Sequence, residues 1–146
     1  MRVYLDSCCL NRPFDDQSQL RVRLEVEAKL DVQQRVLSGE LDLAWSYMLD
    51  YENVMNPFVE RRRAIGQWRS RAVVDVGETP GILRRAEELH GQGISSKDAL
   101  HVACALAAGC DFFITTDDLV LKRAAEVKRI RIVDPPTFLR EVTRDY

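Results

Sequence analysis

The sequence has few of the features that mark fibrous, disordered or membrane proteins. It holds seven glycines and five prolines in 146 residues, and hydrophobic residues make up 46% of it, which excludes a collagen-like fibre or a low-complexity linker. No apolar run approaches the roughly 20 residues of a membrane-spanning helix. Residues 1–6 carry charge and lack the apolar core of a signal peptide. We therefore expect a soluble, cytoplasmic protein of one domain, residues 1–146, with no membrane partner.

Zinc ligands at the usual spacing are also missing. The four cysteines and two histidines are Cys8, Cys9, Cys104, Cys110, His90 and His101. No two cysteines form a Cys-x-x-Cys pair, and the histidines complete no zinc pattern with them. Because a secretory signal is lacking, we expect four reduced thiols that pack as small hydrophobic side chains.

The net charge of −2 hides an uneven distribution of charge. Residues 1–60 carry 6 basic and 11 acidic side chains, whereas residues 61–71 carry five arginines and no acid. We call residues 61–71 the Arg block. A concentrated cationic segment in an otherwise acidic chain suits binding to a polyanion.

Short apolar runs alternate with segments of helical periodicity along the chain. We expect strands at residues 3–5, 41–45, 72–76, 112–115 and 130–133, a loop at 7–18, and helices at 19–37, 46–56, 58–68, 79–90, 95–108, 117–126 and 135–142. This order predicts the α/β class, with three layers (α/β/α) and a mainly parallel central sheet covered by helices on both faces. Residues 99–108 are apolar nearly all round, so we expect their helix to be central.

Acidic residues follow two of the predicted strands. Asp6 comes directly after the first strand and Asp117 after the fourth, and ligands of parallel sheets bind at the carboxyl ends of the strands. Either aspartate could instead form a turn or cap a helix. Asp98 lies in the first turn of the most apolar helix, where the pattern Ser95-x-x-Asp98 also fits a capping box.

A fourth acid comes from the helix after the second strand. Asp50 and Glu52 are two residues apart and face different directions on a helix, so we expect one of them to point inward. Four carboxylates at one sheet edge repel one another and stay ionised together only around a divalent cation. Oxygen ligands without Cys or His indicate a hard ion, Mg²⁺ or Mn²⁺, which can assist phosphodiester hydrolysis.

Four segments, in this order along the chain, resemble the PIN domain. They are Tyr4-Leu5-Asp6-Ser7, Glu52, Lys97-Asp98-Ala99-Leu100-His101-Val102-Ala103 and Phe113-Ile114-Thr115-Thr116-Asp117-Asp118. The resemblance extends from Val3 to about Phe138, and its most specific part is Asp98-Ala99-Leu100-His101 followed by Thr115-x-Asp117. The family includes ribonuclease toxins of the VapC type.

The resemblance implies a divalent-metal-dependent endoribonuclease. Its metal-binding quartet would be Asp6, Glu52, Asp98 and Asp117. Glu52 is favoured over Asp50 because Asn53-Val54 continue the helix from it, as in the family pattern. The implied reaction is attack of a metal-activated water on phosphorus, which leaves a 5′-phosphate and a 3′-hydroxyl.

The resemblance also implies residues and partners around that quartet. Ser7, Thr115 and Thr116 would support the site, and Asp118 would be a possible fifth acid. The substrate would be RNA, and a VapC-type toxin would bind an antitoxin protein. We also expect a homodimer.

The Arg block offers a surface for RNA, since Arg forms bidentate hydrogen bonds with phosphates and Trp stacks on unpaired bases. Its candidate contacts are Arg61, Arg62, Arg63 and Trp68. The alternatives are a solvated helix face with Trp68 packed inward, or a surface for the antitoxin. Arg12 and Lys97 are further candidate phosphate contacts, although Arg12 could pair with Asp15 or Asp16 and Lys97 could be solvated.

Two functions remain open from the sequence. The first is a metal-dependent ribonuclease, and the second is a catalytically weak PIN-like module that binds nucleic acid or protein. The presence of all four acids favours the enzyme, because a protein that holds no metal has no physical reason to keep a repelling cluster. His101 is expected in the core or behind the acids rather than as a metal ligand.

Overall fold

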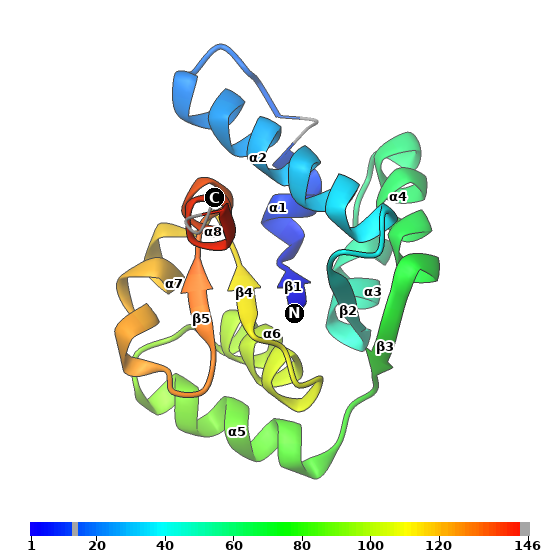
Figure 1. Ribbon diagram of the computed structural model, residues 1–146. Coiled ribbons are helices and arrows are strands. Elements are labelled where there is room, and N and C mark those ends of the chain that lie inside the picture. Colours follow the sequence, from blue (N-terminus) through cyan, green and yellow to red (C-terminus); the bar gives the residue numbers. More distant parts are fainter. Residues whose placement is uncertain (13–14, 144–146) are drawn as a thin grey trace.

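A five-stranded sheet forms the centre of the computed structural model, which describes residues 1–12 and 15–143 (Figure 1). The strands are β1 (Arg2–Leu5), β2 (Asp42–Ser46), β3 (Ala72–Val76), β4 (Phe112–Ile114) and β5 (Arg131–Val133). Their order is β3-β2-β1-β4-β5, and every neighbouring pair is parallel. The predicted α/β class with a parallel sheet is confirmed.

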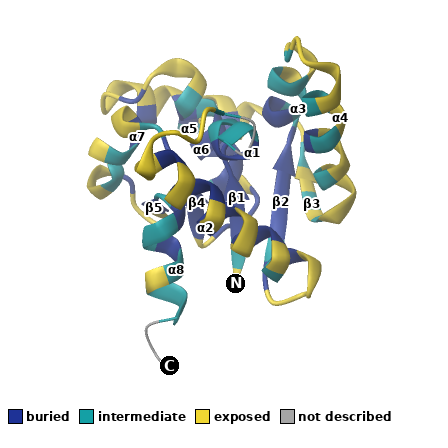
Figure 2. Ribbon diagram, turned by 90° about the horizontal axis from the view of Figure 1, so that it is seen from above, coloured by how far each residue is buried: buried dark blue, intermediate teal, exposed yellow. Residues whose placement is uncertain are grey.

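Helices cover both faces of this sheet (Figures 1 and 2). They are α1 (Ser7–Asn11), α2 (Leu20–Leu37), α3 (Tyr47–Val54), α4 (Val59–Gly66), α5 (Pro80–Gly91), α6 (Ser96–Ala107), α7 (Asp118–Lys122) and α8 (Pro135–Thr143). The two views agree that α2 and α8 lie on one face, whereas α3, α5 and α6 lie on the other. This arrangement gives the three predicted layers.

The core is centred on β1 and α6. Val3, Tyr4 and Leu5 of β1 are fully buried, and the ring of Tyr4 stacks on that of Phe113, its partner in β4, with 5.3 Å between ring centroids. Helix α6 buries Ala99, Val102, Ala103, Cys104 and Ala105. Because most of these side chains are small, α6 packs close to the sheet, and its predicted central position is confirmed.

The predicted loop at residues 7–18 is wrong in its first part, where the chain forms the short helix α1. The side chain of Asp6 caps this helix by accepting a hydrogen bond from the Ser7 amide, and Cys9 and Leu10 are buried beneath it. Polar residues gave this segment the composition of a loop, but the cap and the buried side chains favour a helical turn. Residues 13–14 of the predicted loop lie outside the described residues.

Two predicted helices end earlier than expected and continue as 3-10 turns. Helix α4 ends at Gly66 and is followed by a 3-10 turn at Gln67–Arg71, and α7 ends at Lys122 before a second such turn at Ala124–Glu126. A 3-10 turn is a common continuation at the end of an α-helix.

The cysteines are free thiols, as predicted. Cys9, Cys104 and Cys110 are buried, whereas Cys8 is only partly buried. In the described part of the chain, no helix is both long and apolar enough to cross a membrane.

Candidate active site

Three of the predicted acids follow strands on the carboxyl side of the sheet. Asp6 follows β1, Asp117 caps the helix after β4, and Glu52 lies on α3, which begins directly after β2. The chain runs from β1 outward to β3 on one side, and β4 and β5 lie on the other side of β1. The boundary between β1 and β4 is therefore the switch point at which ligands of open α/β sheets bind.

Asp6 is buried, with 3% of its surface exposed, and its carboxylate accepts several hydrogen bonds. The Ser7 amide donates to Oδ1 at 2.9 Å and the Thr115 hydroxyl donates to Oδ2 at 2.9 Å. The Cys8 thiol lies 3.5 Å from Oδ2. Burial raises the pKa of Asp6, and the nearby charge of Glu52 adds to this effect although the bond from Thr115 opposes it.

Glu52 is held on both carboxylate oxygens. Its Oε1 is 2.5 Å from His101 Nε2 and 3.8 Å from the Lys97 ammonium, and its Oε2 accepts a hydrogen bond from the Ser7 hydroxyl. Burial acts to raise the pKa of Glu52, but the contacts with His101, Ser7 and Lys97 outweigh it and lower the pKa. Glu52 is therefore a well-anchored carboxylate.

His101 connects this acid to the core. It is buried on α6, and its Nδ1 lies 2.6 Å from the Tyr4 hydroxyl, which in turn lies 2.7 Å from the hydroxyl of Ser46. The chain of contacts from Ser46 through Tyr4 and His101 to Glu52 fixes the direction of the Glu52 carboxylate. His101 thus lies behind the acids, in the place the sequence suggested.

Asp50 faces a different part of the molecule. Its Oδ1 accepts a hydrogen bond from the indole of Trp45 at 2.9 Å, and its Oδ2 lies 3.6 Å from the Arg69 guanidinium. These contacts turn Asp50 toward β2 and the Arg block. Of the two acids on α3, Glu52 is the one beside Ser7 and His101.

Asp98 lies in the first turn of α6, half-buried, with the Ser95 hydroxyl donating to its Oδ2 at 2.8 Å. Ser95 precedes α6 but makes no side-chain hydrogen bond to the helix backbone, so the two residues bind each other rather than forming the full capping box. Burial raises the pKa of Asp98, and the charges of Asp6 and Asp117 raise it further. Asp98 therefore lies within reach of the charges of Asp6 and Asp117.

Asp117 is the N-cap of α7. Its Oδ1 accepts a hydrogen bond from the Leu119 amide at 2.9 Å, and its own amide donates to the Thr115 hydroxyl at 3.1 Å. Because the same Thr115 hydroxyl donates to Asp6, Thr115 links the two aspartates. Thr116 is buried, with its amide 3.3 Å from the Cys8 sulfur.

Asp118 turns away from this cluster toward α2. Arg21 binds both of its oxygens, at 2.8 and 3.1 Å, and lowers the pKa of Asp118. Arg21 also lies 3.5 Å from Glu25, a buried acid that Arg12 binds at 3.0 Å. Arg12 pairs in addition with Asp15 at 3.2 Å, which is the alternative that the sequence left open.

The Arg block is engaged mainly in local contacts. The Arg61 guanidinium lies over the ring of Phe58 at 4.7 Å, and Arg62 donates to the backbone oxygen of Asn56 at 3.0 Å. Arg63 is exposed on the same helix. Trp68 is partly buried and packs against the core, as in the alternative with an inward-facing indole.

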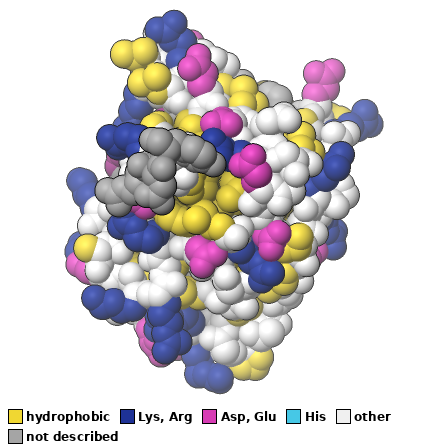
Figure 3. Space-filling view, viewed as in Figure 1, with side chains coloured by type: hydrophobic (Ala, Val, Ile, Leu, Met, Phe, Trp, Pro, Cys, Tyr) yellow, Lys and Arg dark blue, Asp and Glu magenta, His cyan; other side chains and the backbone are white. Residues whose placement is uncertain are grey.

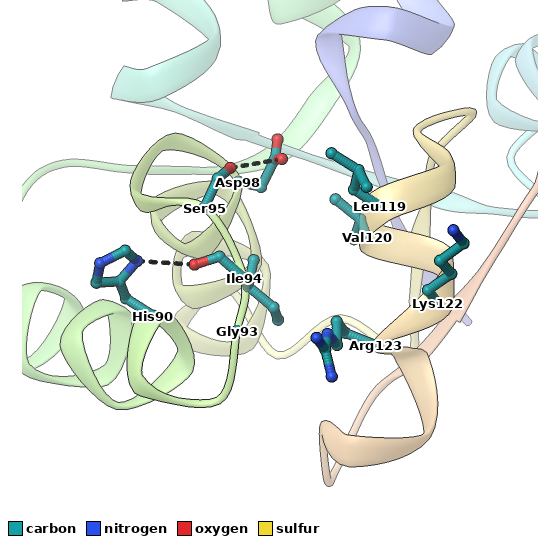
Figure 4. A pocket seen from close by; sticks show the side chains of 9 residues that line it. All are labelled: His90, Gly93, Ile94, Ser95, Asp98, Leu119, Val120, Lys122 and Arg123. Carbon is teal, nitrogen blue, oxygen red and sulfur yellow. Dashed lines mark hydrogen bonds between the residues drawn. The ribbon is translucent and has the colours of Figure 1, made fainter.

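A hollow of about 620 Å³ opens beside Asp98 (Figure 4). One wall is the turn from α5 to α6, and the other is α7 with the residue that follows it. The hollow gives Asp98 an approach from solvent that the more deeply buried Asp6 lacks.

The carboxylates fit a hard divalent ion in their chemistry. Among residues 1–12 and 15–143, no three Asp, Glu, His or Cys side chains are close enough to form a ready-made metal cage. However, besides burial, the charges of Asp6 and Asp117 raise the pKa of Asp98, and a cation bound by these three aspartates would offset that effect of charge. Oxygen donors of this kind suit Mg²⁺ or Mn²⁺.

Sequence reasoning missed two residues that touch the site. Arg21 reaches Asp118 across 97 positions of the sequence, and only its i,i+4 spacing to Glu25 was a readable signal. Cys8 was expected as a simple packing residue, yet its sulfur lies 3.3 Å from the Thr115 hydroxyl. No feature of the sequence signalled that contact.

In a comparison with known protein families, the PIN domain matches residues 3–127. The chain belongs to the PIN domain family. The matched part of this PIN domain contains Asp6, Glu52, Asp98 and Asp117.

Two solved structures share the fold of this PIN domain. One is VapBC2 from Rickettsia felis bound to a DNA fragment from their promoter, with 16% identity, a TM-score of 0.53, and coverage of 90% of this chain and 97% of the other. The second is VapBC-1 from nontypeable Haemophilus influenzae, with 18% identity, a TM-score of 0.61, and coverage of 92% and 98%. A comparison with curated proteins finds no significant match.

Proposed function

We propose that this PIN domain is a divalent-metal-dependent endoribonuclease that hydrolyses phosphodiester bonds of RNA. The observation that carries the proposal is the position of Asp6 and Asp117 after β1 and β4, at the switch point of the sheet, where the Thr115 hydroxyl contacts both residues. The charges of Asp6 and Asp117 also act on Asp98, and a bound cation would offset their repulsion.

Asp6, Asp98 and Asp117 would hold Mg²⁺ or Mn²⁺, and Glu52 would be the fourth acid of the site. When bound, such an ion activates a water and stabilises the developing charge on phosphate oxygens. Ser7 and His101 keep the Glu52 carboxylate in one orientation. Thr115 orients Asp6 and holds the backbone of Asp117 at the same time.

We also propose that the protein is the toxin of a toxin–antitoxin pair and acts in the cytoplasm as a homodimer. Support comes from membership of the PIN domain family and from the shared fold with the two VapBC structures. The chain covers nearly the whole length of both matched chains. Reading the neighbouring gene for a small antitoxin-like protein, followed by co-purification, tests this part.

Cleavage of single-stranded RNA with Mg²⁺ or Mn²⁺ tests the enzyme. We expect Asp6→Asn, Asp98→Asn and Glu52→Gln each to lower the cleavage rate on the order of 100-fold or more, because each removes a charge from the proposed metal site. Asp50→Asn is the matched control and should cleave nearly as well as wild type, since Asp50 binds Trp45 and Arg69 instead.

Equal cleavage by wild type and the Asp6→Asn and Asp98→Asn variants would contradict the proposal. A large loss in Asp50→Asn with none in Glu52→Gln would exchange the roles of the two acids on α3. RNA binding without cleavage by a folded wild-type protein would favour the alternative of a PIN-like binding module.

A further inference from the structure

The hollow beside Asp98 carries two cationic side chains that the proposed metal site does not use. Lys122 ends α7 and Arg123 follows it, and both belong to the lining of the hollow. In Figure 4 the Arg123 side chain extends toward the turn from α5 to α6, whereas that of Lys122 lies on the other side of α7. Asp98 lines the same hollow. The proposed site therefore adjoins a compartment of about 620 Å³ with positive charge on one wall.

These cations are available to a ligand. Among the residues that the structure describes, Arg123 forms an ion pair only with Glu126, at 3.3 Å, and the two side chains are 48% and 46% exposed, which makes the pair weak. Lys122 forms no ion pair with any residue that the structure describes. Binding of an anion by these two side chains would therefore cost little free energy from the contacts that they make now.

Gly93 allows Arg123 to lie across the turn between α5 and α6. Its φ is +101°, and a Cβ at this position would stand 3.1 Å from the central carbon of the Arg123 guanidinium. Any larger residue would therefore be strained and would press on the guanidinium. The turn itself is closed by a hydrogen bond of 2.9 Å between His90 Nδ1 and the backbone oxygen of Ile94.

The rest of the lining is partly apolar. Ile94 and Val120 are buried and Leu119 has 69% of its surface exposed, whereas His90 and Ser95 add polar groups to the same lining. An occupant that suits this lining combines a phosphate with a flat or apolar body. In the face drawn in Figure 3, Lys and Arg side chains alternate with Asp and Glu.

We propose that this hollow binds one unpaired nucleotide of the RNA substrate, next to the bond that is cut, with its phosphate on Arg123 and Lys122. The inference rests on the proposed ribonuclease function and names the part of the molecule that receives the strand. A pocket of this size suits a nucleotide-sized ligand, and single-stranded RNA offers bases that can turn into it, whereas the bases of a duplex stay stacked. The phosphate contacts position the strand, and the apolar part of the lining packs against sugar and base.

Binding of fluorescein-labelled single-stranded RNA to the Asp6→Asn variant tests the inference without cleavage. We expect the added double substitution Lys122→Gln/Arg123→Gln to raise Kd about 10-fold at low salt. The slope of log K against log salt should become less negative by about 1.4, since each lost phosphate contact contributes about 0.7 for a single strand. Unlabelled duplex RNA should compete less well than single-stranded RNA.

The matched control is Arg84→Gln/Arg85→Gln, which removes the same charge elsewhere. Arg85 also forms an i,i+3 pair with a glutamate, Glu88, at 2.8 Å, and both arginines line a different hollow beside Gly109, Cys110 and Asp111. Those three residues precede β4, so this hollow lies at the opposite edge of the sheet. The control should change Kd by less than about 3-fold.

Several results would overturn the inference. Equal weakening by both double substitutions would show an effect of net charge alone, and no weakening by either would show that the hollow does not bind the strand. In the Asp6-containing protein, the Lys122/Arg123 double substitution should raise KM and leave kcat nearly unchanged. If wild type cleaves RNA and the Lys122/Arg123 double substitution leaves KM unchanged, the nucleotide site is rejected and the proposed function is kept. If wild type neither binds nor cleaves RNA, the proposed function is rejected as well.

Discussion

Lys29 on α2 is a buried cation without a counter-charge. Its surface is 4% exposed, and no residue that the structure describes forms a hydrogen bond or ion pair with it. Glu25, one turn earlier, is occupied by Arg12 and Arg21. Burial lowers the pKa of Lys29 to about 8, so the folded protein holds the charged form less favourably than the unfolded chain does.

Replacing Lys29 by Met should therefore stabilise the protein by about 1–3 kcal/mol at pH 7, because the substitution removes a buried charge and keeps a chain of similar length. The unfolded chain binds the proton of Lys29 more tightly than the folded protein does. The gain in stability from the substitution is therefore complete below about pH 8 and decreases as the pH rises from there toward the pKa of lysine in the unfolded chain. Urea unfolding of both proteins at pH 7 and at pH 9.5 measures it. A destabilised Lys29→Met protein would contradict the prediction.

Single residues also show where prediction from sequence ends. The positions of Asp6 and Asp117 followed from the strands that precede them, because a parallel sheet brings its carboxyl ends to one edge. The choice between Asp50 and Glu52 did not follow from the residues alone, because it depends on His101 and Trp45, which come from other elements. Pairs such as Arg21 and Asp118 are set by tertiary packing, which the local pattern does not encode.

Three elements are joined by the hydroxyl of Tyr4. It lies on β1 and contacts Ser46 at the end of β2 and His101 on α6, all of them buried. Tyr4→Phe would leave both partners short of a hydrogen bond inside the core. We expect a loss of about 1–3 kcal/mol in the free energy of unfolding.

Tyr47→Phe provides the matched comparison. The hydroxyl of Tyr47 is buried and has no hydrogen-bond partner in the described part of the chain, so its removal should leave stability unchanged or slightly raised. Thermal unfolding of the two variants beside wild type tests the pair. Equal destabilisation by both substitutions would mean that the Tyr4 contacts contribute little.

Whole elements were easier to predict than their ends. The long periodic segments gave α2, α5 and α6 within about two residues of their observed bounds. The short helix α1 was missed because its five residues carry no period, and its cap on Asp6 forms only when β1 is in place beside β4. The 3-10 turns after α4 and α7 depend in the same way on packing at the helix ends.

At the scale of the molecule, the repelling acids should make stability depend on divalent metal. Wild-type protein should unfold at a higher temperature in millimolar Mn²⁺ than in EDTA, because an ion that binds only the folded state stabilises it. Asp98→Asn should show little or no rise. Without metal it should be at least as stable as wild type, since it relieves repulsion from Asp6 and Asp117.

Differential scanning fluorimetry measures the unfolding temperatures of wild type and Asp98→Asn, each with Mn²⁺ and with EDTA. An equal rise for wild type and Asp98→Asn would place the ion elsewhere. Absence of any rise in wild type, combined with metal-dependent cleavage, would mean that the ion binds tightly only with RNA present.

The strand order has a consequence for how the chain becomes active during its synthesis. The first strand made, β1, is the central one, and it lacks a neighbour on one side until residues 112–114 of β4 have been added. The proposed site likewise draws its acids from positions 6, 52, 98 and 117. A nascent chain on the ribosome thus has no complete site until Asp117 has emerged. An enzyme that cuts RNA would in this way be harmless to the message that encodes it until translation has passed that residue.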